Sequence, residues 1–235
     1  MSGQGNSRGV VGTVRSAYGG FAAVFVALAF VLGMGTAHAQ SEPVKLAVLG
    51  DSIAAGYGLS PDQAFPVRLQ AALVAQGRKV TVLNHSVSGD TTAGGLERVD
   101  WMLADKPDIV LVALGGNDML RGTDPAATER NLDAIVAKLK AAGVTVWLAG
   151  MMAPRNFGPE YAKAFDGLYG RLAAKYDVPL YPFLLDGIAQ TDGLNQTDGI
   201  HPNTKGVDVL IERLLPFVVK NLDLHAASGH RPPRP

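Results

Sequence analysis

Two hydrophobic periodicities alternate along the chain after about residue 44. Short apolar runs rich in leucine and β-branched residues are typical of strands that are buried on both faces of a sheet. Five such runs occupy residues 45–49, 80–83, 108–114, 144–148 and 178–181. Apolar residues recur at helical spacing in residues 66–76, 125–142, 161–176 and 205–222.

Proline and glycine mark the ends of several of these predicted helices. Pro125 stands at the start of one helix and Gly143 directly follows its end, which are boundary signals. Pro216 lies inside the last helix and should bend it. Buried strands separated by helices favour parallel pairing, with helices on both faces of the sheet. The pattern therefore predicts a single α/β domain of the doubly wound kind, which binds its ligand beyond the carboxyl ends of its strands.

The first 39 residues have the order of a secretory signal peptide. Arg8 and Arg15 precede an apolar run at 21–32, and small residues then lead to Ala37-His38-Ala39. A permanent membrane anchor is the alternative, but the run is shorter than the ~20 residues that a bilayer crossing needs.

These observations predict three segments. We expect a cleaved signal at 1–39, one folded domain at 40–225 and a disordered tail at 226–235. Such a protein is periplasmic or secreted in a bacterium, and it keeps no stable membrane span after cleavage.

Composition narrows the function classes. The 235 residues suit one domain, and Lys+Arg and Asp+Glu both total 21. This balance and the absence of a basic stripe argue against nucleic acid. Cysteine is absent, which excludes thiol catalysis and disulfides, and the His and Asp residues show no recognisable metal-ligand pattern. We expect a monomer without metal or cofactor.

A carboxylate and an imidazole stand three positions apart near the C-terminus. Asp198 and His201 lie in a turn-rich segment, and Pro202 stiffens the loop behind them. An imidazole whose tautomer is held by a carboxylate is what a general base requires. Of the five histidines, one lies in the predicted signal and two lie near the C-terminus, which leaves His85 and His201. His201 is favoured because of Asp198.

Ser52 is the candidate nucleophile. It follows the first predicted strand, where its hydroxyl would be exposed at the sheet edge and its backbone N–H could face an anion. A helix N-cap is the structural alternative. The Gly-x-Ser-x-Gly elbow is not met, because Ala54 stands in place of its second glycine. Asp51 is interpreted as a brace for the turn.

Two other loops after strands offer donors for an anion. Gly89 lies among small hydroxyl residues and can present a bare backbone N–H, while Asn117 follows two glycines and carries an amide. The alternatives are an ordinary loop in which Asp90 or Thr91 caps the following helix, and a tight turn that asparagine tolerates.

Taken together, these stretches resemble a known family. GDSI at 50–53, SGDTT around Gly89, GGND at 115–118 and DGIHP at 198–202 are similar, in order and spacing, to the four blocks of the SGNH (GDSL-type) hydrolases. The resemblance extends from about Lys45 to Leu222 and is greatest to the branch of periplasmic multifunctional esterases, thioesterases, lysophospholipases and arylesterases. Ile53 in place of the usual leucine is the one departure in the first block.

The resemblance implies a fold and a mechanism. The fold is a three-layer α/β/α sandwich, flavodoxin-like, with a five-stranded parallel sheet. Ser52 would be the nucleophile, His201 the base and Asp198 its orienting carboxylate. The oxyanion hole would consist of the backbone N–H groups of Ser52 and Gly89 and the amide of Asn117. The expected activity is hydrolysis of carboxylic esters and thioesters through an acyl-enzyme.

Substrate choice rests on fewer residues. Met119, Leu120 and a loop that contains Phe157 follow predicted strands and could line an apolar trough for an acyl chain. Core packing is the alternative for all three. A carbohydrate O-acetyl esterase with the same triad and a binding protein without catalysis are the other function classes.

Overall fold

The computed structural model describes residues 3–5, 8–10, 12 and 42–229. Residues 42–229 form the folded unit to which all of the following applies. The apolar run and cleavage site of the predicted signal lie outside the described residues, as do residues 230–235 of the predicted tail.

One parallel sheet forms the centre of this unit. Its strand order is β2-β1-β3-β4-β5, and all four neighbouring pairs are parallel. The strands are β1 (Val44–Gly50), β2 (Val80–Asn84), β3 (Ile109–Ala113), β4 (Thr145–Ala149) and β5 (Leu180–Tyr181). Each of the five predicted runs overlaps one strand, which confirms the predicted parallel α/β sheet. The central strand β3 is buried along its whole length, because helices cover both faces.

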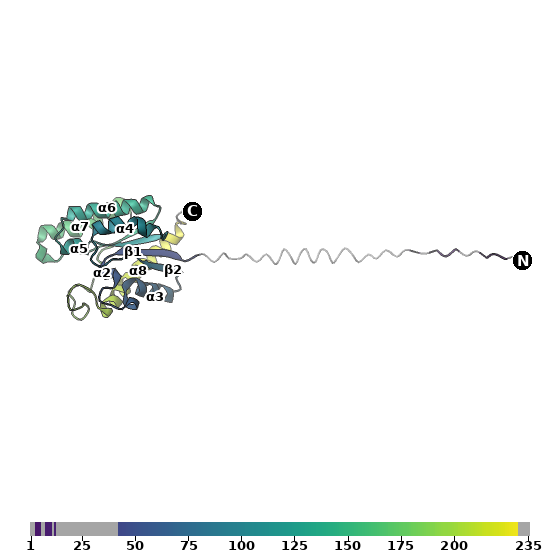
Figure 1. Ribbon diagram of the computed structural model, residues 1–235, viewed down its shortest axis with the longest axis horizontal. Helices are drawn as coiled ribbons and strands as arrows, with labels where there is room; N and C mark the ends of the chain where they lie inside the picture. The colour runs from purple at the N-terminus through teal and green to yellow at the C-terminus, as the bar shows by residue number, and fades with distance from the viewer. Residues whose placement is uncertain (1–2, 6–7, 11, 13–41, 230–235) are drawn as a thin grey trace. The chain divides into compact units, whose positions relative to one another are not determined.

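Helices cover the sheet on both sides, so the three-layer prediction is also confirmed (Figure 1). The layer on one face contains α4 (Thr92–Leu103), α6 (Pro125–Ala141) and α7 (Pro159–Tyr176), which pack side by side. The opposite layer pairs α3 (Phe65–Ala75) with α8 (Thr204–Ala227). Short helical segments complete the unit: α2 (Ser52–Ala55), η1 (Pro61–Gln63), α5 (Gly116–Leu120) and η2 (Arg155–Phe157).

Helix α4 shows why periodicity alone does not mark every element. Gly94 and Gly95 fall in its first turns, and glycine weakens a helix by roughly 1 kcal/mol relative to alanine. Gly95 is required by packing, since a Cβ there would lie 2.3 Å from the Leu114 side chain. Thr91 caps the helix by accepting a hydrogen bond from the Gly94 N–H at 3.3 Å, as its residue type predicts.

The C-terminal helix is longer than its pattern predicts. Helix α8 passes through Pro216 and ends at Ala227, beyond the predicted end at Leu222 and inside the predicted tail. His225 explains the extension, because its ring is buried and its Nδ1 lies 3.0 Å from Thr145 Oγ1 at the start of β4. This contact holds the last turns of the helix against the sheet.

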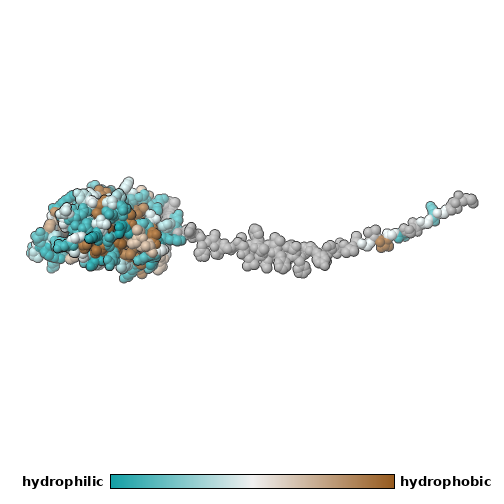
Figure 2. Space-filling view, turned by 90° about the horizontal axis from the view of Figure 1, so that it is seen from below, coloured by the Kyte–Doolittle hydropathy of each residue, from teal (hydrophilic) through white to brown (hydrophobic). Residues whose placement is uncertain are grey.

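The surface of the unit is mixed in character. Figure 2 shows hydrophilic residues interspersed with apolar patches over the face in view. Among the described helices, none combines the length and the apolar character needed to cross a lipid bilayer.

Candidate active site

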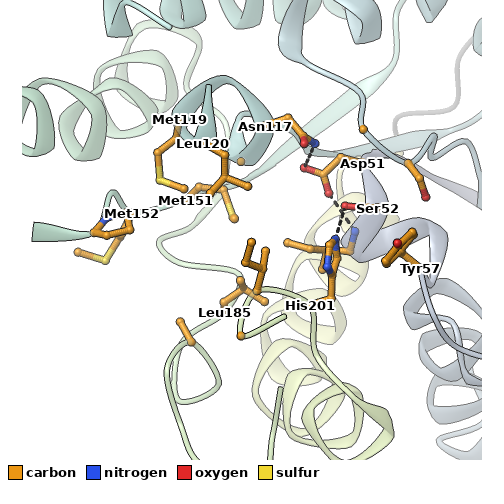
Figure 3. A pocket seen from close by; sticks show the side chains of 18 of the residues that line it. Asp51, Ser52, Tyr57, Asn117, Met119, Leu120, Met151, Met152, Leu185 and His201 are labelled. Atoms are coloured by element: carbon orange, nitrogen blue, oxygen red, sulfur yellow. Dashed lines mark hydrogen bonds between the residues drawn. The ribbon is translucent and has the colours of Figure 1, made fainter. Parts of the chain in front are cut away.

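The structure brings Ser52, His201 and Asp198 together at the carboxyl edge of the sheet. Ser52 is the first residue of α2 and is separated from the end of β1 only by Asp51, and the other two lie in the loop before α8. His201 Nε2 lies 2.8 Å from Ser52 Oγ (Figure 3). His201 Nδ1 lies 2.6 Å from Asp198 Oδ2. The hydroxyl and the imidazole therefore meet across 149 positions of sequence.

Asp198 is fixed by the turn that it begins. Its Oδ1 accepts hydrogen bonds from the backbone N–H groups of Ile200 at 2.9 Å and His201 at 3.0 Å. Partial desolvation opposes ionisation, but these two bonds and the His201 ring outweigh it and lower the pKa of Asp198 from 3.8 to about 2. An ionised carboxylate can only accept, so it fixes the His201 tautomer with the proton on Nδ1 and leaves Nε2 free to accept the Ser52 proton.

A sharp turn places the Ser52 hydroxyl. Asp51 caps α2 through Oδ1, which accepts from the Ile53 N–H at 3.0 Å. Gly56 ends the helix with φ at +79°, a conformation that favours glycine, and its N–H donates to the Ser52 carbonyl. Burial is the main cause that raises the pKa of Asp51 from 3.8 to about 6. The residue is thus a brace for the turn and also a buried titratable group beside the site.

Gly89 and Asn117 line the same cavity as Ser52. Gly89 has φ at +83°, which exposes its peptide at the loop after β2. Asn117 lies in α5, and its Nδ2 donates to the Asp90 carbonyl at 2.9 Å. The same Nδ2 approaches Asp51 Oδ2 at 3.4 Å (Figure 3). Both neighbours are acceptors, so the amide turns its NH₂ group, and not its carbonyl oxygen, towards them.

An apolar cavity of about 430 Å³ opens beside these polar groups. Met119 and Leu120 line it, together with Met151 and Met152 from the loop after β4. Figure 3 shows these side chains on the side of the cavity away from Ser52. The structure does not bring Phe157 into this lining. Its ring faces Tyr161 instead, with centroids 5.5 Å apart, because η2 turns it towards α7.

The sequence analysis did not predict the part of the cavity wall that follows β5. Phe183 and Leu185 line the cavity and follow β5 directly, so the signal that could find them is their place after a strand. The Leu184 N–H donates to the Gly150 carbonyl at 2.8 Å, which ties this loop to the end of β4. Tyr57 was also missed as a neighbour of the imidazole, and its ring centroid lies 4.7 Å from that of His201.

His85, the other candidate base, lies apart from the cavity. Its ring is buried against Trp101, and its Nε2 lies 3.1 Å from Asp105 Oδ2. Within the part of the chain that the structure describes, no group of three or more His, Asp or Glu side chains is placed to hold a metal ion.

A hydroxyl, an imidazole and a carboxylate connected in this order, at the head of an apolar cavity, define a serine hydrolase. Comparison with known proteins then specifies the family. The model of the GDSL-like lipase/acylhydrolase family matches residues 48–209. The chain belongs to this family and is an esterase.

Individual relatives cover most of the folded unit. Esterase TesA of Pseudomonas aeruginosa is 43% identical over 190 residues, which are 80% of this chain and 92% of that protein. Thioesterase 1/protease 1/lysophospholipase L1 of Escherichia coli K12 is 40% identical over 178 residues, 74% of this chain and 84% of the relative. Among solved structures, the psychrotrophic esterase EstA from Pseudoalteromonas sp., inhibited by monoethylphosphonate, has a TM-score of 0.73 at 32% identity, covering 76% of this chain and 98% of that one.

Proposed function

We propose that this esterase cleaves carboxylic esters and thioesters of apolar acyl groups through an acyl-enzyme on Ser52. The observation that carries the proposal is the hydrogen-bonded chain from Ser52 through His201 to Asp198 at the head of an apolar cavity.

The geometry supports a two-step mechanism. His201 Nε2 takes the proton of the Ser52 hydroxyl while its oxygen attacks the acyl carbon. The imidazolium then gives that proton to the leaving alcohol or thiol. Water, deprotonated by the same nitrogen, attacks the acyl-enzyme and releases the acid. Asp198 stays ionised throughout and stabilises the imidazolium.

Three donors are suited to the oxyanion. The backbone N–H groups of Ser52 and Gly89 and the amide of Asn117 all border the cavity. In this role each would stabilise the charge that develops on the carbonyl oxygen, by on the order of 3 kcal/mol for one donor.

The cavity wall favours an acyl chain over a sugar. Methionines 119, 151 and 152 and leucines 120 and 185 give the wall its apolar character, and methionine adapts to chains of different shape. The named activities of the Escherichia coli relative support thioesters and lysophospholipids as substrates. A carbohydrate O-acetyl esterase would require polar partners for the sugar ring along this wall.

We also propose that the protein is exported and acts as a monomer. The pattern of residues 1–39 supports a cleaved signal, with a mature protein that begins at Gln40 in the periplasm or medium and acts as a monomer. N-terminal sequencing of the periplasmic protein and its mass in solution by light scattering test these points. A protein that retains residues 1–39 in the membrane fraction would contradict cleavage.

A substrate profile tests the chemistry. Rates are measured on p-nitrophenyl acetate, butyrate, octanoate and palmitate, on acyl-CoAs and on lysophospholipids, with Ser52→Ala as the control. We expect higher kcat/KM for longer acyl groups than for acetate, and loss of nearly all activity in the variant. Wild-type turnover by Ser52→Ala would refute the nucleophile, and activity restricted to acetylated sugars would refute the acyl substrate.

A further inference from the structure

Arg98 of α4 occupies a position behind the oxyanion donors, outside the cavity lining. Its Nε donates to Asp90 Oδ2 at 2.7 Å, and its Nη2 lies 2.5 Å from the same oxygen. Its Nη1 donates to the His85 carbonyl at 2.8 Å, and Nη2 also reaches the Gly50 carbonyl at 3.4 Å. One guanidinium thus connects the ends of β1 and β2 with the loop that precedes α4.

These contacts are adjacent to every proposed oxyanion donor. Asp90 directly follows Gly89, and its carbonyl accepts the Asn117 amide at 2.9 Å. Gly50 lies two positions before Ser52, and its carbonyl also accepts the Val87 N–H at 3.1 Å. A shift of the guanidinium would therefore move the peptides or partners of all three donors together.

The pair is largely shielded from solvent. The side chains of Arg98 and Asp90 are 19% and 14% exposed, in contrast to the surface ion pairs of the described chain, which are mostly more open. Arginine suits this place because its planar fork can serve three acceptors in fixed directions, whereas lysine is a point charge without that geometry.

We propose that Arg98 is a positioning residue for this esterase, aligning the oxyanion donors through Asp90 and Gly50 without touching the substrate. The proposal rests on the proposed function, since it assigns the support of the same oxyanion hole. Small displacements of such donors reduce transition-state stabilisation more than ground-state binding.

Steady-state kinetics of Arg98→Lys and Asp90→Asn test this role. Active sites are counted by reaction with an organophosphonate taken to completion. The value of kcat is then calculated per reactive site, so that unfolded protein does not lower it. We expect kcat per active site to fall about tenfold or more in both variants, with KM changed by less than about twofold. Arg171→Lys is the matched control, since Arg171 forms a bidentate pair with Glu129 between α7 and α6, away from the cavity. It should retain wild-type kcat.

A double-mutant cycle separates positioning from general stability. In an Asn117→Ala background the loss caused by Arg98→Lys should shrink, because part of the hole is already absent. Full additivity, unchanged kcat per active site, or an equal loss in Arg171→Lys would overturn the inference. Any of these results with an inactive Ser52→Ala would leave the proposed function in place, whereas an active Ser52→Ala would overturn both.

Discussion

Asp51→Asn should change how the free energy of unfolding depends on pH. The Asp51 side chain is buried at the carboxyl end of β1, beside Ser52 and Asn117. Burial is the largest cause that raises its pKa from 3.8 to about 6, and the charge of Asp90 adds to it. The Ile53 N–H and the charge of His201 oppose the change without cancelling it.

The sign follows from proton linkage. The folded protein keeps the Asp51 proton to higher pH than the unfolded chain, so this group favours folding below about pH 4 and its contribution is lost as pH rises through about 6. One pKa unit corresponds to about 1.4 kcal/mol. A change from 3.8 to about 6 therefore corresponds to about 3 kcal/mol. Asparagine does not titrate, so the variant should gain about that much stability relative to the wild type between about pH 4 and about pH 7.

Urea denaturation of both proteins across this pH range, followed by circular dichroism, gives the difference in unfolding free energy at each pH. Asparagine caps helices about as well as aspartate, and any fixed offset from altered contacts does not depend on pH. The same substitution at Asp192, an exposed aspartate, controls for the chemistry of the change. A difference that stays constant with pH would refute the claim that burial holds the Asp51 proton.

Five further substitutions, one of them a control, address the site directly. Asn117→Ala should lower kcat by roughly 100-fold or more if its amide stabilises the oxyanion; an effect on KM alone would remove it from that role. Gly89→Ala should lower the free energy of unfolding by about 1–2 kcal/mol, because alanine is strained at φ +83°, and it should also lower kcat. A Cβ at this position meets only Arg121 at 4.0 Å, so the expected loss comes from the backbone and not from a clash. An unchanged free energy of unfolding would contradict this expectation. Asp198→Asn should retain more activity than a variant that lacks the His201 imidazole. Equal losses of kcat in the two purified variants would contradict this. Met119→Ala should shift the chain-length profile of p-nitrophenyl esters towards bulkier acyl groups. Phe157→Ala is the control and should leave the profile unchanged, since Phe157 lies outside the cavity lining. Identical profiles for the two variants would refute the assignment of this cavity to the acyl group.

Much of the fold follows from local signals. Strand β3 is recognisable because its residues are apolar at every position, and a strand buried on both faces requires this. The ends of α6 follow from Asp124, which caps the helix, and from Gly143 after it. Helix α4 is harder to recognise, because Gly94 and Gly95 weaken its first turns and only the Thr91 cap marks its start. Gly95 is required by the approach of Leu114 and not by helix propensity.

The candidate site, like the fold, could be predicted from the sequence only in part. Asp198 and His201 are close in sequence, so a turn suffices to join them, and the four family blocks identify Ser52, Gly89 and Asn117. Phe157 shows the limit of this reasoning. It stands in the loop predicted to line the cavity, but side-chain packing against Tyr161 decides where its ring lies.

The sequence by itself determined the five strands along the chain, the helices α3, α6, α7 and α8, the polar groups at the strand ends and the class of chemistry, because these depend on residue type and short-range spacing. Tertiary structure alone decided that Ser52 Oγ and His201 Nε2 lie 2.8 Å apart, that Phe183 and Leu185 complete the cavity, and that Arg98 connects Asp90 with the Gly50 carbonyl. The physical reason is that such contacts depend on the order of the strands within the sheet and on the packing of the helices against it. Residues that are neighbours in the sequence encode neither.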